Sequence, residues 1–164
     1  MVREILRTVQ EAVGPSAKVF VKLSPFSYPR ALAEVANAIS QFEIVKAVVS
    51  MNTFPNACLF DEKGRSRITV RQGLAGLSGP AVKPIAIGQV IQLRHLLPKN
   101  IDIVYAGGIT HGKDILDAQL AGAPVAQMCT HLLQFPPESW PDVFTQIMSE
   151  YVEELKKRQS AKTK

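Results

Sequence analysis

The stretch Ile103-Val104-Tyr105-Ala106-Gly107-Gly108-Ile109 decides the fold, because it reads as an apolar strand that ends in two glycines. A helical stretch over 114–121 follows, and then a second apolar strand that ends in the small residues Cys129 and Thr130. Turns of this kind after the last two strands of a (β/α)₈ barrel form the phosphate-binding corner of that fold. Glycine lets the backbone approach a phosphate, and N–H groups at a helix start favour the anion. The sequence therefore predicts a site for a phosphorylated cofactor, although Gly107-Gly108 alone is also consistent with a simple tight turn.

Composition and length describe one soluble globular domain. The chain has 164 residues, of which 46% are hydrophobic and 20% are charged. No apolar run approaches the roughly 20 residues of a membrane-spanning helix, and the first residues do not form a secretory signal. Cys58 and Cys129 lack the spacing of a metal site or a disulfide framework, and His95, His111 and His131 lack ligand spacing. We expect a cytoplasmic protein without a metal site or a membrane interaction.

Basic residues near the end of the chain supply much of the net charge of +5. A solvated helix end explains them, because cations suit a helix C-terminus. Nucleic-acid binding would require basic residues interleaved with aromatic ones or a recognisable module, and the sequence has neither. We therefore expect no nucleic acid partner, and divide the chain into a folded part over 1–155 and a basic tail over 156–164. The basic residues of that tail are Lys156, Lys157, Arg158, Lys162 and Lys164.

Predicted helices and strands alternate along the chain. Apolar residues recur at helical spacing, and short apolar runs between these segments predict strands. Alternation of this kind is typical of parallel β/α units. A closed barrel needs eight strands and roughly four are predicted, so the chain reads as half of a barrel. The predicted strands are 19–21, 44–49, 101–105 and 125–128, and the predicted helices begin near Val2, Pro29, Pro84, Lys113 and Ser139.

The connection over 54–81 is unusually long, and connections of this length in a compact domain are usually functional or disordered. Within it, the apolar runs Cys58–Phe60 and Ile68–Val70 flank Lys63-Gly64, and this pattern predicts a hairpin. The segment 73–81, directly before a helix, is rich in glycine, so its backbone N–H groups are suited to face an anion.

Polar residues also follow the ends of two predicted strands, where a barrel assembles its site. Lys22 ends the first strand, and a cation there can stabilise negative charge on a bound group such as the N1–O2 edge of a reduced flavin. Asn52 and Thr53 end the second strand, and an amide offers both a donor and an acceptor to a planar ligand. Each position alone is equally consistent with a solvated lysine or an ordinary loop. Chance would not place four such features on one face, so together they predict a binding site.

Four motifs resemble the dihydroorotate dehydrogenases, most closely the soluble class 1 enzymes. They are Phe20-Val21-Lys22-Leu23-Ser24-Pro25, Ser50-Met51-Asn52-Thr53, Gly76-Leu77-Ser78-Gly79-Pro80-Ala81-Val82-Lys83-Pro84-Ile85-Ala86 and Ala106-Gly107-Gly108-Ile109. Their order and spacing fit from about Lys18 to Tyr151, and the third is also similar to the FMN domain of dihydropyrimidine dehydrogenase. The resemblance implies an α/β fold that is the C-terminal half of a (β/α)₈ TIM barrel, with parallel strands 5–8 and helices outside.

The resemblance also implies roles for single residues. Lys22 would contact the flavin ring as a stabilising cation, Met51 would pack beside the ring, and Asn52 and Thr53 would bind the pyrimidine substrate. The implied reaction is FMN-dependent oxidation of dihydroorotate to orotate in pyrimidine biosynthesis: a base removes the C5 proton, and a hydride passes from C6 to flavin N5. The residues implied around the FMN phosphate are Gly79, Gly107, Gly108, Cys129 and Thr130.

The chain departs from the family pattern at two points. Cys129 stands where the family usually has glycine; the dihydropyrimidine dehydrogenase domain accepts a cysteine there, so an activity of that kind stays open. The family's catalytic base is a cysteine or serine in the first half of the barrel, and neither Cys58 nor Cys129 matches it. We therefore assign no catalytic base in this chain, and the implied partner is a second copy or a complementary half-barrel chain. The alternative is a truncated remnant or flavin-binding module without catalysis.

Overall fold

A computed structural model describes residues 1–162 of the chain. The main sheet has four strands in the order β1-β2-β5-β6, and every neighbouring pair is parallel. These strands are β1 (Val19–Lys22), β2 (Val45–Val49), β5 (Asp102–Ala106) and β6 (Val125–Gln127). The predicted α/β half-barrel with parallel strands is confirmed.

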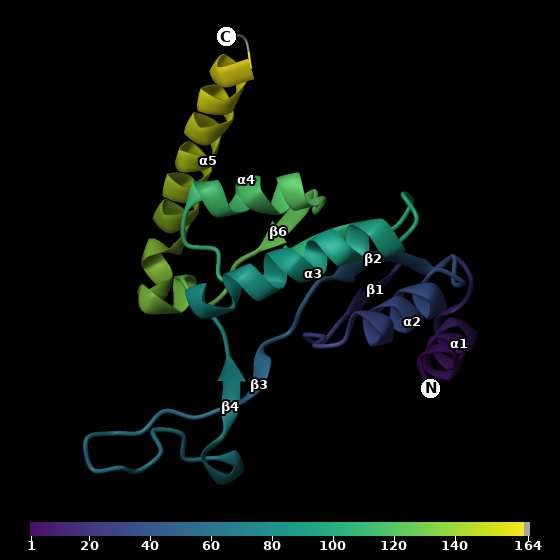
Figure 1. The fold of residues 1–164 in the computed structure, drawn as a ribbon, viewed down its shortest axis with the longest axis horizontal. Helices are drawn as coiled ribbons and strands as arrows, with labels where there is room; N and C mark the ends of the chain where they lie inside the picture. Colours follow the sequence, from purple (N-terminus) through teal and green to yellow (C-terminus); the bar gives the residue numbers. More distant parts are fainter. Residues whose placement is uncertain (163–164) are drawn as a thin grey trace.

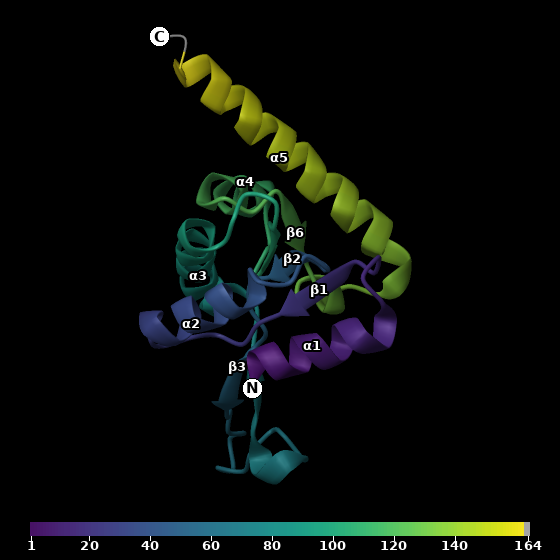
Figure 2. The same cartoon turned by 90° about the vertical axis from the view of Figure 1, so that its right-hand side faces the viewer.

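Helices cover one face of this sheet and form an arc around the strands (Figure 1, Figure 2). Local sequence explains where they begin and end. Pro29 occupies the first turn of α2, where its missing N–H has no helical partner, and Gly122 ends α4 with a φ of 109°. The helices are α1 (Val2–Val13), α2 (Pro29–Ile39), α3 (Lys83–Leu96), α4 (Gly112–Ala121) and α5 (Trp140–Lys162), with short 3₁₀ turns η1 (Arg71–Gly73), η2 (Pro80–Val82), η3 (Leu132–Gln134) and η4 (Pro137–Ser139).

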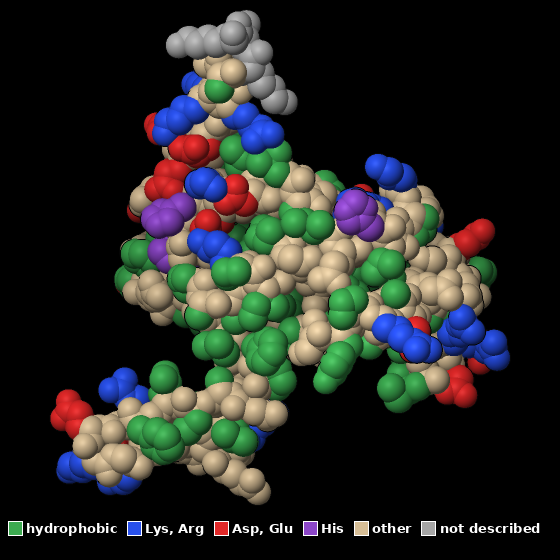
Figure 3. Space-filling view, viewed as in Figure 1, with side chains coloured by type: hydrophobic (Ala, Val, Ile, Leu, Met, Phe, Trp, Pro, Cys, Tyr) green, Lys and Arg blue, Asp and Glu red, His purple; other side chains and the backbone are tan. Residues whose placement is uncertain are grey.

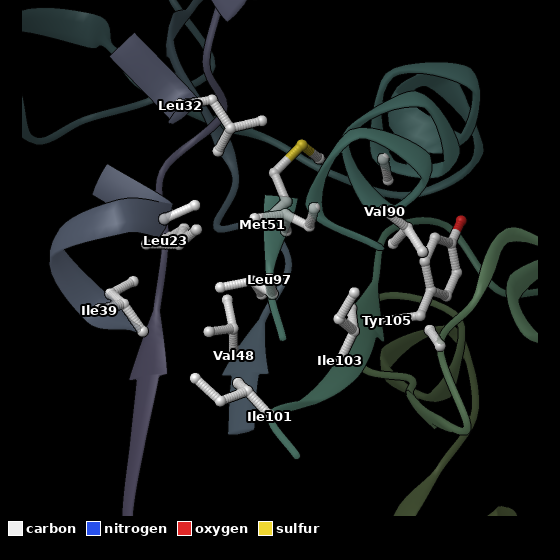
Figure 4. Packing of buried hydrophobic residues seen from close by; sticks show 14 of the residues in the cluster. Leu23, Leu32, Ile39, Val48, Met51, Val90, Leu97, Ile101, Ile103 and Tyr105 are labelled. Atoms are coloured by element: carbon white, nitrogen blue, oxygen red, sulfur yellow. The ribbon is translucent and has the colours of Figure 1, made fainter. Parts of the chain in front are cut away.

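The hydrophobic core lies between the sheet and the helices. Val48, Ile103 and Tyr105 face the helices from the two central strands and are completely buried. Figure 4 shows Val90 of α3 beside Tyr105 of β5. Burying an aliphatic side chain of this size contributes about 1.5–3 kcal/mol. Packing in this core therefore stabilises β2 and β5, the two strands whose carboxyl ends lead into the loops of the site.

The opposite face of the sheet is only partly covered. Ala47, Val49 and Val104 form a small buried cluster on it. Phe20 and Val125 lie beside this cluster in the strand register, and they are 62% and 50% exposed. Within residues 1–162, β1 and β6 each pair with one strand only, so both outer edges of the sheet are free. Further strands would close this face and these edges in a complete barrel.

The long connection forms an arm that projects from the body of the molecule (Figure 1). Its base is an antiparallel pair, β3 (Phe54–Ala57) with β4 (Ala75–Leu77). The predicted turn at Lys63-Gly64 is present, but the predicted pairing of 58–60 with 68–70 is wrong, because Phe60 bridges to Ser66 instead. The Asp61 carboxylate causes the tighter pairing, since it accepts hydrogen bonds from the backbone N–H groups of Lys63 and Arg65, both at 2.9 Å.

The last helix, α5, runs without a break from Trp140 to Lys162. The predicted basic tail continues this helix as far as Lys162, and Thr163 and Lys164 lie outside the described residues. Among the apolar residues of α5, Ile147 is buried, but Phe144 and Met148 are about half exposed. Within residues 1–162, no helix is both long enough and apolar enough to cross a bilayer.

Candidate functional site

A cavity of about 460 Å³ opens where the parallel strands end. The carboxyl ends of parallel strands meet at one edge of a sheet, so the residues that follow β1, β2, β5 and β6 come together there. All nine residues that the sequence nominated line this one cavity: Lys22, Met51, Asn52, Thr53, Gly79, Gly107, Gly108, Cys129 and Thr130.

Other lining residues were not nominated. Most of them lie inside the quoted motifs or in the predicted strand 125–128, so their places could have been inferred from the sequence. Phe144 is different, because it comes from α5, and no sequence signal links this apolar helix residue to the cavity. The lining residues beyond the nominated nine are Ser78, Val82, Ala106, Ile109, Ala126, Gln127, Met128 and Phe144.

At one end of the cavity, two glycine turns touch backbone to backbone. A β-carbon on Gly108 would lie 2.4 Å from the carbonyl oxygen of Gly79, and one on Gly107 would lie 2.3 Å from the β-carbon of Ala86. Gly108 and Gly79 also have φ values of 76° and 77°, which side chains rarely allow. Only glycine therefore fits this corner.

The same corner offers hydrogen-bond donors without acceptors. Within residues 1–162, the backbone N–H groups of Gly79, Gly107, Gly108 and Thr130 make no hydrogen bond. The Thr130 hydroxyl donates to the hydroxyl of Ser78 at 3.0 Å, which joins the turn after β6 to the turn after β4. Several N–H groups without an acceptor in one part of a cavity suit an anion such as a phosphate.

The start of α4 does not contribute to this anion corner. A helix start offers N–H groups to an anion, but none of residues 110–114 lines the cavity, and three N–H groups there already have side-chain acceptors. The N–H of Gly112 donates to the Glu150 carboxylate at 2.8 Å, and the N–H groups of Thr110 and His111 donate to the Asp114 carboxylate at 2.8 and 3.0 Å. The donors for an anion are therefore those of the glycine turns and Thr130.

A nearly buried ion pair lies behind the corner. The Lys83 ammonium, which follows the Gly79 turn, donates to the Asp114 carboxylate at 2.6 Å. Burial by itself raises the pKa of Asp114, but hydrogen bonds from Lys83, Thr110 and His111 outweigh it and hold that pKa below its ordinary value. The charged carboxylate thus ties the segment after Gly107-Gly108 to the start of α3.

The other end of the cavity carries a cation and an amide. Lys22 ends β1, and its side chain makes no hydrogen bond or ion pair within residues 1–162. The Asn52 side-chain oxygen accepts from the N–H of Thr53 at 2.9 Å, and its NH₂ group has no acceptor within residues 1–162. A β-carbon on Gly76 would lie 2.0 Å from the Thr53 hydroxyl oxygen, so glycine lets β4 pass close to this residue. Polar groups at one end and an anion corner at the other suit an elongated ligand.

Titratable groups are sparse in the cavity. The lining residues include one lysine, Lys22, and one cysteine, Cys129, but no carboxylate and no histidine. Cys58 lies on the arm, with its sulfur 3.7 Å from the Ser66 hydroxyl. Among residues 1–162, no three His, Cys, Asp or Glu side chains gather as a metal site.

Comparison with known proteins identifies a family. The family model for dihydroorotate dehydrogenase matches residues 1–154. The chain is 34% identical to a probable dihydroorotate dehydrogenase A (fumarate) of Enterococcus faecalis over 81% of its length. It is 35% identical to the catalytic subunit of dihydroorotate dehydrogenase B (NAD(+)) of Methanopyrus kandleri over 68% of its length.

A solved structure shares the fold. The dihydroorotate dehydrogenase of Eimeria tenella, in complex with ferulenol, superposes on 87% of this chain with a TM-score of 0.68 and 21% sequence identity. The chain spans only part of these proteins: 42% of the Enterococcus protein, 35% of the Methanopyrus protein and 35% of the Eimeria chain.

Proposed function

The chain belongs to the dihydroorotate dehydrogenase family, and on that premise we propose that its cavity binds FMN for the oxidation of dihydroorotate to orotate. One observation carries the proposal: the nine nominated residues line a single cavity whose glycine corner has unpaired backbone donors. That corner fits a phosphate, because only backbone without side chains can approach it so closely.

The two ends of the cavity bind different parts of FMN. The N–H groups of Gly79, Gly107, Gly108 and Thr130 hold the phosphate, and Cys129 lies beside them. When bound, FMN supplies the acceptor for a hydride. The Lys22 ammonium then stabilises negative charge on the N1–O2 edge of the ring.

The substrate lies against the polar residues that follow β2. The amide of Asn52 and the hydroxyl of Thr53 donate to and accept from the pyrimidine, while Met51 packs beside the flavin ring. The lining residues include no carboxylate or histidine, and Cys129, which lies beside the phosphate donors, does not match the position of the family's cysteine or serine base. We propose that the base comes from another polypeptide, a complementary half-barrel or a second copy of this chain.

Titration of the purified chain with FMN tests the cofactor assignment. Charge-assisted hydrogen bonds to the phosphate contribute about 1.5–3 kcal/mol each, but the open face leaves much of the ring in water. We expect weak binding, with a Kd of about 10–100 µM or looser, and little quenching of flavin fluorescence. Lys22→Ala should change the flavin absorption spectrum more than the Kd. If FMN does not bind at millimolar concentration, the assignment is wrong.

A second candidate function is flavin binding without catalysis, favoured by the missing base among the lining residues. Anaerobic mixing of the FMN-loaded chain with dihydroorotate separates the two. Bleaching of the flavin by the chain alone would mean that this chain, or a second copy of it, supplies the base. Bleaching only after a complementary half-barrel is added supports the first proposal. No bleaching in either case supports the non-catalytic function.

A further inference from the structure

Gln89 is a polar side chain in the middle of the core. It lies on α3 beside the completely buried Val90 and is itself 2% exposed. A buried amide is costly unless its donors and acceptor are paired. Both kinds of group are paired here: Nε2 donates to the carbonyl oxygens of Ser24 at 3.0 Å and Ser50 at 2.5 Å, and Oε1 accepts from the N–H of Phe26 at 2.8 Å.

These three bonds reach the two loops that carry the polar end of the cavity. Ser24 comes two residues after Lys22, and Ser50 comes two residues before Asn52. The loops also touch directly, because the N–H of Asn52 donates to the carbonyl of Leu23 at 2.7 Å. Gln89 therefore holds together, from beneath, the two loops that present the cation and the amide.

Ser50 extends the same network to the anion corner. It is completely buried, and its hydroxyl accepts a hydrogen bond from the N–H of Ala106 at 3.1 Å. Ala106 directly precedes Gly107-Gly108. One chain of hydrogen bonds thus links the ends of β1, β2 and β5 behind the cavity.

We propose that Gln89 is a positioning residue that sets the distance between Lys22 and Asn52 and thereby shapes the ring-binding end of the cavity. Gln89 acts through the two loops, since it is not among the residues that line the cavity. The inference rests on the proposed function only in taking the ligand to be a flavin. None of the three hydrogen bonds of Gln89 goes to the phosphate corner, which lies at the other end of the cavity and is also supported by the Lys83–Asp114 pair.

Gln89→Met tests the proposal, because it keeps the length of the side chain and removes its hydrogen bonds. Gln92→Met is the matched control: the same change on the same helix, where the amide only donates to the carbonyl of Gly88 at 3.4 Å. Both variants are titrated with FMN and with riboflavin at a temperature where circular dichroism shows them folded. Gln89→Met should weaken both ligands by the same factor, about tenfold, as expected for the loss of one or two hydrogen bonds to the ring. Riboflavin lacks the phosphate of FMN, so damage to the phosphate corner would weaken FMN alone. An unchanged ratio of the two affinities would therefore show that only the ring-binding end has changed.

Hydrogen exchange without any ligand gives a second measurement. The amides of Phe26 and Asn52 should exchange at least about tenfold faster in Gln89→Met and at the wild-type rate in Gln92→Met. Unchanged exchange, or flavin affinities equal to those of Gln92→Met, would overturn the proposal. If the wild type binds neither flavin, the proposed function fails and exchange alone decides the role of Gln89.

A smaller substitution tests the same network in case Gln89→Met does not fold. Ser50→Ala removes one hydroxyl and keeps the backbone carbonyl that Gln89 binds. The amide of Ala106 should then exchange faster, and riboflavin should bind more weakly than to the wild type. Wild-type exchange at Ala106 together with wild-type riboflavin affinity would contradict the network.

Discussion

At the scale of single residues, Gly108 combines a positive φ with a close approach to the backbone of Gly79. Gly108→Ala would place a β-carbon 2.4 Å from the Gly79 carbonyl oxygen, at a φ of 76°. The two turns must then separate, and we expect FMN binding to fall below detection. Gly88→Ala is the control, since its β-carbon would meet no atom within 4 Å and alanine should stabilise α3 by roughly 0.5–1 kcal/mol. FMN titration and urea unfolding measure both effects, and wild-type affinity in Gly108→Ala would contradict the assignment of the corner.

The ion pair between Lys83 and Asp114 should matter far more than a similar pair on the surface. Lys83→Met leaves a carboxylate that is 7% exposed without its cation, and we expect a loss of about 2–4 kcal/mol in the free energy of unfolding. Lys113→Met breaks the pair of Lys113 with Asp117, in which the lysine side chain is 63% exposed. We expect this change to lower the free energy of unfolding by less than about 1 kcal/mol. Urea denaturation of the two variants compares them directly. Equal losses would show that the buried pair has no special role.

The lowered pKa of Asp114 predicts a dependence of stability on pH. The charged form is favoured in the folded chain, so the unfolded chain takes up the proton first as pH falls. The stabilisation is complete above the unfolded pKa, about 3.9, and is lost as pH drops through the lower folded pKa. The free energy of unfolding should therefore fall more steeply below about pH 4 in the wild type than in Asp114→Asn. Parallel curves for the two proteins would contradict this.

At the scale of elements, the projecting arm should be the least stable part. Its strands β3 and β4 form only a two-stranded ribbon, and such ribbons are marginal by themselves. Hydrophobic side chains gather on the arm (Figure 3), and Leu59, Phe60 and Val70 are all more than 60% exposed. Brief trypsin treatment should cut near Lys63 and Arg65 before it cuts between the helices of the body, as mass spectrometry would show. First cuts within α2 or α3 would refute this.

Periodicity predicted the helices and parallel strands well, because each repeats a local pattern. The strand pairing of the arm was predicted wrongly, because two non-repeating contacts determine it. The Asp61 carboxylate accepts a hydrogen bond from the N–H of Lys63, and Gly76 approaches Thr53 closely. The positions of the nominated site residues followed from strand ends. Gln89 was missed, because in sequence a polar residue inside an apolar helix segment carries no sign of what it binds. The partners of such a side chain lie 39 to 65 residues away, so only the folded chain shows them.

At the scale of the whole molecule, the open face and edges predict assembly. Free strand edges beside exposed apolar residues are rarely tolerated by an isolated chain, and here Phe20 is 62% exposed next to an unpaired edge. We expect the purified chain to form at least a dimer, or to require a complementary half-barrel for solubility. Phe20→Gln should lower the average mass in light scattering at micromolar concentration, because it makes the open face polar. Ile91→Gln, on α3 and 44% exposed, is the control and should leave the mass unchanged. A well-behaved wild-type monomer without a partner would rule out assembly through this face, and FMN affinity would then reflect the single chain alone.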